Sequence, residues 1–164
     1  MNNFNWSNSI CGMHKAHHSE VLKYMPELIP VMASFPNDVT EFVWDVKIHM
    51  LMPRQYPCIP NWHSDLVPRD HKLLEQWDKI DPSAPMYLWI SNEPLPEFFD
   101  GREVKAQTWV RFNQLDTHRG TESKKHIWRC FIRASHASIC EFNPLEKQVR
   151  KHVQIYLDSA NFRW

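Results

Sequence analysis

The stretch TEFVWDVKIHMLM, residues 40–52, decides the fold because its side chains alternate in character. Every second position carries an apolar side chain: Phe42, Trp44, Val46, Ile48 and Met50. The intervening positions are mostly polar: Val43, Asp45, Lys47, His49 and Leu51. Successive side chains of an extended chain point to opposite faces, so this period of two predicts a β-strand. We expect one face of the strand to pack on a core and the other to be mostly polar.

Shorter stretches predict further elements around this strand. Four more strands are predicted at residues 86–91, 109–113, 127–134 and 149–157. A short helix is predicted at residues 19–25, where Pro26 ends it, and a helical turn at residues 71–77. Residues 92–100 contain two prolines and are predicted to be a loop that leads into the turn pair Asp100-Gly101.

The chain of 164 residues is expected to form a single domain, 1–164, with one hydrophobic core. Residues 1–39 are predicted to be an N-terminal helical or irregular layer, and residues 40–164 a β core. Twelve prolines and only three glycines favour extended segments and rigid turns over long helices. The pattern therefore predicts a mainly β protein, a sandwich or open barrel with one or two short helices.

The composition argues against several classes of protein. The formal net charge is zero, whereas proteins that coat nucleic acid carry a large basic excess, so there is no strong nucleic-acid signal. No apolar run approaches the length of a membrane span, and the first residues do not resemble a secretory signal. The four cysteines form no Cys-x-x-Cys pair and are expected to be reduced thiols, which makes the cytoplasm the expected location. The oligomeric state is not predicted.

Two histidines and one aspartate form the candidate site. The run Pro60-Asn-Trp-His-Ser-Asp65 holds a His-x-Asp pair, and Asp116-Thr-His-Arg-Gly120 supplies a later histidine. Residues i and i+2 of an extended chain point to the same side, so His63 and Asp65 could converge on one ion. His118 reaches the same point only if the chain folds back as antiparallel sheet. Two imidazoles and one carboxylate are the ligands of a 2-His-1-carboxylate iron site.

This order of His63, Asp65 and a distant His118 resembles the iron(II)/2-oxoglutarate-dependent dioxygenase superfamily, in particular its phytanoyl-CoA-hydroxylase-type members. The resemblance implies a double-stranded β-helix, the jelly-roll or cupin-like fold, and an enzyme that hydroxylates a substrate with Fe(II) and 2-oxoglutarate. It also implies an arginine after the distal histidine that binds the far carboxylate of 2-oxoglutarate. Arg129 and Arg133 stand eleven and fifteen positions after His118 and share one face of a predicted strand. A guanidinium suits this role because it donates two parallel hydrogen bonds to a carboxylate.

Other residues extend this hypothesis. A hydroxyl from Tyr87 is proposed as a further contact to the cofactor, and Tyr56 is an alternative that no motif favours. Asp116 is a candidate fourth ligand, or an acceptor that orients an imidazole. His14 and His18 would share one face of a helix as a zinc pair, although solvated histidines are the favoured interpretation there.

Alternatives from other functional classes stay open. His63 and Asp65 could be an ordinary loop pair, and the two arginines could be exposed on a half-solvated strand. A second hypothesis is then a non-catalytic jelly-roll module that binds a small anion, nucleotide or sugar. A third is a protein-interaction factor, such as a phage-encoded inhibitor of a host protein, in which the many aromatic side chains could form the contact patch. Residues 47–53 and the following Trp-His-x-Asp segment resemble uncharacterised bacteriophage proteins, a resemblance that implies no activity. The host cytoplasm would then be the location.

Overall fold

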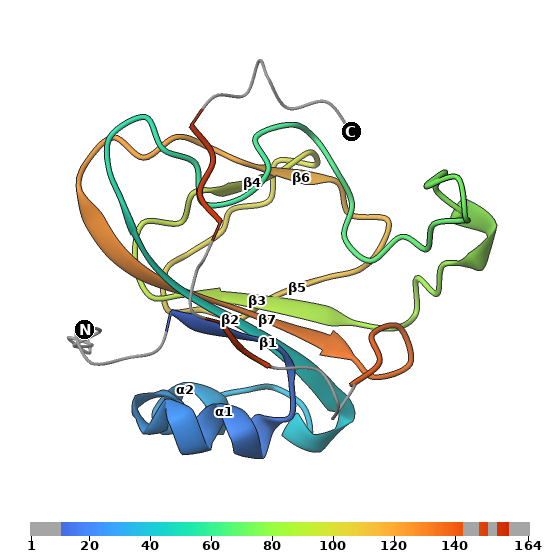
Figure 1. Ribbon diagram of the computed structural model, residues 1–164, viewed down its shortest axis with the longest axis horizontal. Helices are drawn as coiled ribbons and strands as arrows, with labels where there is room; N and C mark the ends of the chain where they lie inside the picture. Colours follow the sequence, from blue (N-terminus) through green and yellow to red (C-terminus); the bar gives the residue numbers. More distant parts are fainter. Residues whose placement is uncertain (1–10, 143–147, 151–153, 158–164) are drawn as a thin grey trace.

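The computed structural model describes residues 11–142, 148–150 and 154–157, and within them the protein is mainly β (Figure 1). Its strands are β1 Gly12–Ala16, β2 Phe42–Leu51, β3 Met86–Ile90, β4 Pro96–Phe98, β5 Val110–Phe112, β6 His118–Gly120, β7 Ile127–His136 and β8 Val149–Arg150. Two short α-helices, α1 His18–Tyr24 and α2 Ile29–Ala33, and three 3₁₀ turns, Pro26–Leu28, Val39–Glu41 and Trp77–Lys79, complete the described elements. The predicted mainly β character, with one or two short helices, is confirmed.

The two most strongly alternating stretches form the centre of the main sheet. Its strand order is β5-β3-β7-β2-β1-β8, and every pairing is antiparallel. The long strands β2 and β7 pair without interruption from Phe42 opposite His136 to Leu51 opposite Ile127. This register places Asp45 opposite Arg133, a pairing that matters for the site described below.

The N-terminal layer covers one face of this sheet, below it in Figure 1. Apolar side chains from α1, α2 and their connections pack there against Trp44 and its neighbours. Phe35 is at the centre, with ring centroids 4.9–5.1 Å from those of Phe42, Trp44, Tyr87 and Trp109. Residues 1–10 of the predicted layer 1–39 lie outside the described residues, and residues 11–39 include both α-helices.

The same N-terminal region also contributes a strand that the sequence pattern did not predict. Gly12 in β1 lies so close to β2 that a Cβ atom there would be 2.2 Å from the carbonyl oxygen of Val46. Only glycine permits this approach of the two backbones, and the short polar strand carries no alternation strong enough to identify it.

The second, two-stranded sheet pairs β4 with β6 and lies on the other side of the main sheet (Figure 1). A second core, built around Met86, Leu88, Phe98 and Phe112, fills part of the space between the two sheets. The polar face of β2 therefore points into the protein, with Asp45 only 3% exposed. One face of β2 packs on the core as expected. The polar face is also covered, by the second sheet and its core.

Three local predictions were wrong. Residues 92–100 include the strand β4 rather than only a loop, because β6 offers a partner for it. Residues 71–76 form no helical turn, and the 3₁₀ turn Trp77–Lys79 begins only at the last predicted residue. The Asp70 carboxylate accepts the backbone N–H groups of Lys72 and Leu74, which stabilises a tight turn instead. Of the predicted strand 149–157, only Val149–Arg150 is a strand among the described residues, and residues 151–153 lie outside them. Within the part of the chain that the structure describes, no helix is long and apolar enough to cross a membrane.

Candidate metal centre

The backbone brings the two predicted histidine ligands together. His63 and His118 form an antiparallel bridge in which each residue donates its N–H to the carbonyl of the other, at 2.9 and 2.8 Å. The segment around His63 thus runs alongside β6. Residues directly opposite each other in such a bridge have neighbouring side chains, and the ring centroids of the two imidazoles are 4.5 Å apart.

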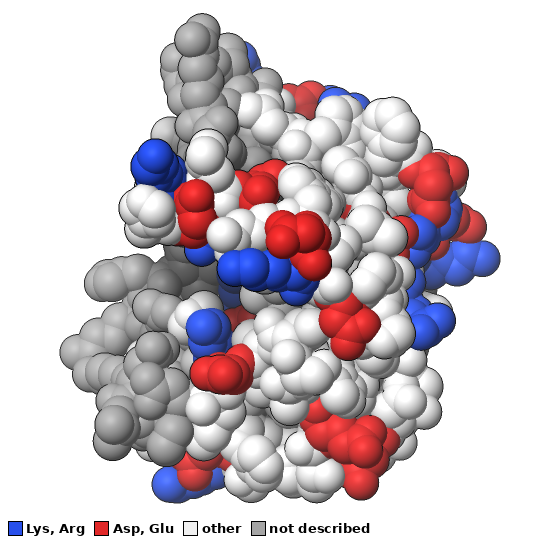
Figure 2. All heavy atoms as spheres, turned by 90° about the vertical axis from the view of Figure 1, so that its right-hand side faces the viewer, with Lys and Arg blue, Asp and Glu red and all other residues white. Residues whose placement is uncertain are grey.

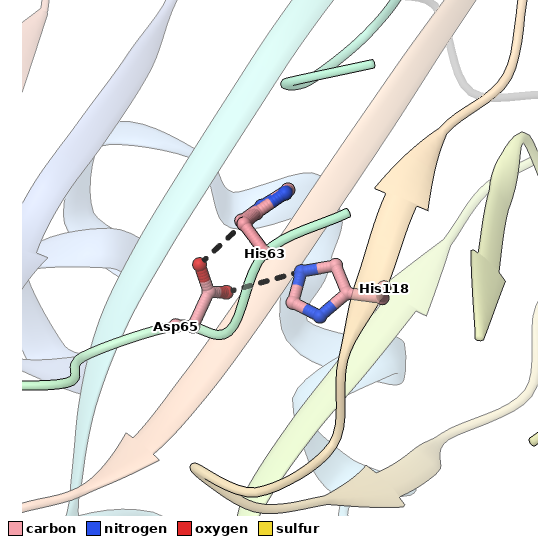
Figure 3. A group of neighbouring side chains, drawn as sticks. All are labelled: His63, Asp65 and His118. Atoms are coloured by element: carbon pink, nitrogen blue, oxygen red, sulfur yellow. Dashed lines mark ion pairs between the residues drawn. The ribbon is translucent and has the colours of Figure 1, made fainter. Parts of the chain in front are cut away.

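Asp65 completes a cluster of three donor groups (Figure 3). Its Oδ1 is 3.9 Å from Nε2 of His63, and its Oδ2 is 3.6 Å from Nε2 of His118. One donor atom from each residue lies within 4.8 Å of the other two. Donors about 2.1 Å from a common ion lie about 3.0 Å apart at right angles, so a small closing movement of these side chains would suffice to bind an ion.

The hydrogen bonds of the two imidazoles present the same nitrogen to the cluster. Nδ1 of His63 is 2.8 Å from the carbonyl oxygen of Asn61, and Nδ1 of His118 is 3.2 Å from that of Asp116. A carbonyl oxygen only accepts, so each Nδ1 carries a proton, and in the neutral imidazole the free lone pair is then on Nε2. This is the tautomer that a metal ligand needs, and a backbone acceptor on the other ring nitrogen is typical of such ligands.

A buried chain of charges supports the carboxylate of Asp65. Arg133 donates from one terminal nitrogen to Asp65 at 2.8 Å and from the other to Asp45 at 2.6 Å. Asp45 in turn accepts from Nδ1 of His14 at 2.8 Å and from the backbone N–H of Lys15 at 3.1 Å. Arg133 is therefore shared between two carboxylates, and it is not exposed on a half-solvated strand.

Opposing effects act on the pKa values of these groups. Burial raises the pKa of Asp65, but the charge of Arg133 and its hydrogen bond to the carboxylate outweigh this effect, so that this pKa lies below its usual value. The same balance, with Arg133 and His14 as the favourable partners, lowers the pKa of Asp45. Burial lowers the pKa of His63, which keeps its imidazole neutral at neutral pH. The cluster thus holds an ionised carboxylate beside a neutral imidazole.

The cluster opens into an internal cavity of about 180 Å³ between the two sheets. Apolar side chains form much of its wall, among them Leu88, Phe112 and Phe131. Polar and charged side chains complete it: His14, Asp45, Lys47, Cys58 and Tyr156, besides the cluster and Arg133. The cavity can therefore hold a small polar molecule next to the three donor groups.

Arg129 lies beyond Phe131 on the same face of β7. It is fully buried, and its three guanidinium nitrogens have no hydrogen-bond partner among the described residues. Burial lowers its pKa only to about 10, so the group stays charged at neutral pH. Its charge acts on the thiol of Cys58, a residue of the cavity wall. A buried charge without a partner is costly, which makes Arg129 a candidate for binding an anion.

Three of the weaker candidates lie elsewhere. Tyr87 is on the opposite face of the main sheet, where its hydroxyl accepts from the side-chain amide of Asn37 at 2.7 Å. The carboxylate of Asp116 pairs with Arg102, so Asp116 assists His118 only through its backbone carbonyl. No helix carries both His14 and His18, because His14 belongs to β1 and His18 begins α1.

Sequence reasoning missed three residues of the site. Asp45 and His14 hold Arg133 in place, and Tyr156 lines the cavity where Tyr87 was expected. The polar positions of residues 40–52 could have indicated Asp45 as a site residue, because the face that carries them is covered by the second sheet. No local pattern marks His14 or Tyr156. No family model, curated protein or solved structure matches this chain.

Proposed function

We propose that this protein is a non-haem Fe(II)- and 2-oxoglutarate-dependent oxygenase, and that its two sheets form a jelly roll around the metal centre. The observation that carries the proposal is the convergence of His63, Asp65 and His118, with the two Nε2 atoms 3.9 and 3.6 Å from the carboxylate oxygens of Asp65. Two imidazoles and one carboxylate match the ligand set of this class of iron enzyme.

The residues around the cluster suit the metal. The neutral tautomer of each imidazole and the ionised state of Asp65 are the protonation states in which these groups bind a cation. Arg133 keeps Asp65 ionised and restrains it from one side, while the backbone carbonyls of Asn61 and Asp116 restrain the two rings.

The cavity also suits 2-oxoglutarate. Of the two arginines implied by the resemblance, Arg129 is buried and Arg133 is partly buried; Arg133 already binds two carboxylates, whereas Arg129 has no hydrogen-bond partner among the described residues. We therefore assign the far carboxylate to Arg129, which is two positions along β7 from Phe131 of the cavity wall but is not itself part of that wall, with Lys47 in the wall as a second positive charge. Fe(II) with 2-oxoglutarate would supply the activation of dioxygen that hydroxylation needs. The chain's own part is to orient the ligands, bind the anion and exclude water with the apolar wall.

Titration with Mn(II), followed by electron paramagnetic resonance, tests the metal centre. We expect wild-type protein to bind one Mn(II), and His63→Ala and His118→Ala to lose this binding. His71→Ala is the matched control, because His71 is an exposed histidine outside the cluster. Unchanged Mn(II) affinity in His63→Ala would contradict the proposal.

The role of Arg129 needs a separate experiment. Conversion of 2-oxoglutarate to succinate by the Fe(II)-loaded protein is expected to fall strongly in Arg129→Met. Arg111→Met, which removes an exposed arginine, should leave it unchanged. Absence of any succinate from Fe(II)-loaded wild-type protein would contradict the use of 2-oxoglutarate.

The buried Arg129 also favours a second candidate function, a non-catalytic module that binds a small anion. This function needs no metal, so anions would raise the melting temperature of metal-free protein, and His63→Ala would retain the effect. An anion effect that disappears in His63→Ala would exclude the module.

A further inference from the structure

A wide groove lies on the outer side of the metal centre. Its volume is about 820 Å³, and its walls come from residues 59–65, residues 69–77 and Thr117. His63, Asp65 and Ile59 line both this groove and the internal cavity. The two spaces therefore meet at the metal centre, with the cavity on one side and the groove on the other.

The two spaces differ in the size of molecule they can hold. Binding sites for drug-sized ligands usually measure about 300–1,000 Å³. The groove is within this range, whereas the internal cavity, at about 180 Å³, is below it. A substrate larger than a small co-substrate would have to approach the centre from the groove.

The charges of the groove are already paired. Among the described residues that line it, Arg69 and Glu75 form an ion pair at 2.8 Å, and Asp65 is paired with Arg133. Figure 2 shows the side of the molecule that carries the excursion 66–85, with acidic and basic side chains beside one another on a mostly uncharged surface. A charged substrate would find no unpaired partner in this groove.

Two indole rings stand at the groove instead. Trp62 is 39% exposed and Trp77 is 46% exposed, which is unusual for such large apolar side chains. Two neighbours restrain Trp62: its ring contacts that of Phe99 at a centroid distance of 5.3 Å, and the Arg119 guanidinium lies 4.5 Å from its centroid. Exposed rings held in this way are suited to stacking against a flat ligand.

We propose that this groove is the substrate site of the oxygenase and that it selects an uncharged molecule with a flat aromatic or heteroaromatic ring. The ring stacks on Trp62 or Trp77, and the atom to be oxidised reaches the metal centre between His63 and Asp65. The inference rests on the proposed function for the reaction, but the ring-binding site itself can be tested without it.

Indole serves as the uncharged aromatic probe, and saturation-transfer NMR on metal-free protein measures its binding. Stacking on an aromatic side chain is worth roughly 1–3 kcal/mol, so at least one of Trp62→Ala and Trp77→Ala should weaken indole binding about five-fold or more. Trp128→Ala is the control, because Trp128 is exposed on β7 and does not line the groove. Benzoate and cyclohexanol, one charged and one without an aromatic ring, should bind more weakly than indole. Unchanged indole binding in both variants, or equal binding of the other two probes, would overturn the inference.

Relaxation by Mn(II) then locates the probe. Mn(II) bound at the cluster should broaden the proton signals of bound indole in wild-type protein, and diamagnetic Zn(II) in its place should leave them sharp. Indole that binds without broadening, although Mn(II) is bound, would place the ring elsewhere and overturn the inference. Tryptophan-dependent indole binding in a protein that does not bind Mn(II) would overturn the proposed function and still support the ring site.

Discussion

Arg133 of β7 donates a 2.8 Å hydrogen bond to Asp65, the carboxylate of the candidate metal centre, and so links that centre to the main sheet. The second terminal nitrogen of Arg133 binds Asp45, directly opposite on β2. One partly buried cation is thus shared by the buried Asp45 and the partly buried Asp65. The position of Asp65 therefore depends on the register between β2 and β7 as well as on its own loop.

Removal of Arg133 should therefore affect both stability and metal binding. Arg133→Met leaves Asp65 and Asp45 buried without their partner, and breaking a buried pair in this way costs about 3–5 kcal/mol. Urea unfolding measures the loss. Arg133→Lys, which keeps one charge, should recover part of the stability but not the paired geometry, and its Mn(II) affinity should stay below that of wild type. Wild-type stability and affinity in Arg133→Met would show that the network is without consequence.

His49 should make the protein less stable in mild acid. Burial, together with the charges of Arg129 and Lys47, lowers the pKa of His49 to about 3 in the folded protein. The unfolded chain, with a histidine pKa of about 6.5, binds more protons between these two values. The stability that neutral His49 provides is therefore fully present above about pH 6.5. It falls as the pH drops toward 3, by up to about 1.4 kcal/mol per pH unit.

The free energy of unfolding, measured from pH 7 to pH 4 in wild type and in His49→Phe, checks this prediction. The variant should have a shallower dependence on pH in this range. Equal slopes in the two proteins would mean that His49 binds protons in the folded protein as it does in the unfolded chain.

Phe35 should contribute to stability without any effect on the metal centre. It contacts four aromatic rings beneath the main sheet, on the face opposite the cluster. Phe35→Ala should cost about 3–5 kcal/mol because it leaves a cavity in the core. Mn(II) affinity, measured under conditions where the variant is folded, should equal that of wild type; a large decrease would mean that the two layers are coupled.

Gly120 should be required for the position of His118. A Cβ atom at Gly120 would lie 2.8 Å from the carbonyl oxygen of Cys58 and 2.9 Å from its Sγ, so Gly120→Ala must displace β6 or the neighbouring segment. We expect a loss of about 1–3 kcal/mol, by analogy with overpacking, and weaker Mn(II) binding.

Gly101→Ala is the matched control for this change. Gly101 has a φ of +77° with no atom near its missing Cβ, so alanine there is strained without a clash. Calorimetry should find lower stability but unchanged Mn(II) affinity. If both alanine variants bind Mn(II) as wild type does, the space at Gly120 is not needed for the cluster.

The sequence by itself determined the centre of the fold and part of the site. The alternation in residues 40–52 and 127–134 was enough to predict β2 and β7, because a period of two is a local property of an extended chain. The spacing of His63 and Asp65 was enough to predict that both could face one point. The class of fold followed from these strands and from the scarcity of glycine.

Only the tertiary structure decided which distant residues meet. The backbone bridge between His63 and His118, the inward turn of Asp45, and the place of Tyr156 all depend on pairings between segments far apart in the chain. The two arginines show most clearly what the sequence could not predict. They share a strand face, yet Arg133 binds two carboxylates and Arg129 binds none among the described residues. Local periodicity gives the face of a strand, but the partner of a buried charge is set by the strand and the layer that pack against it.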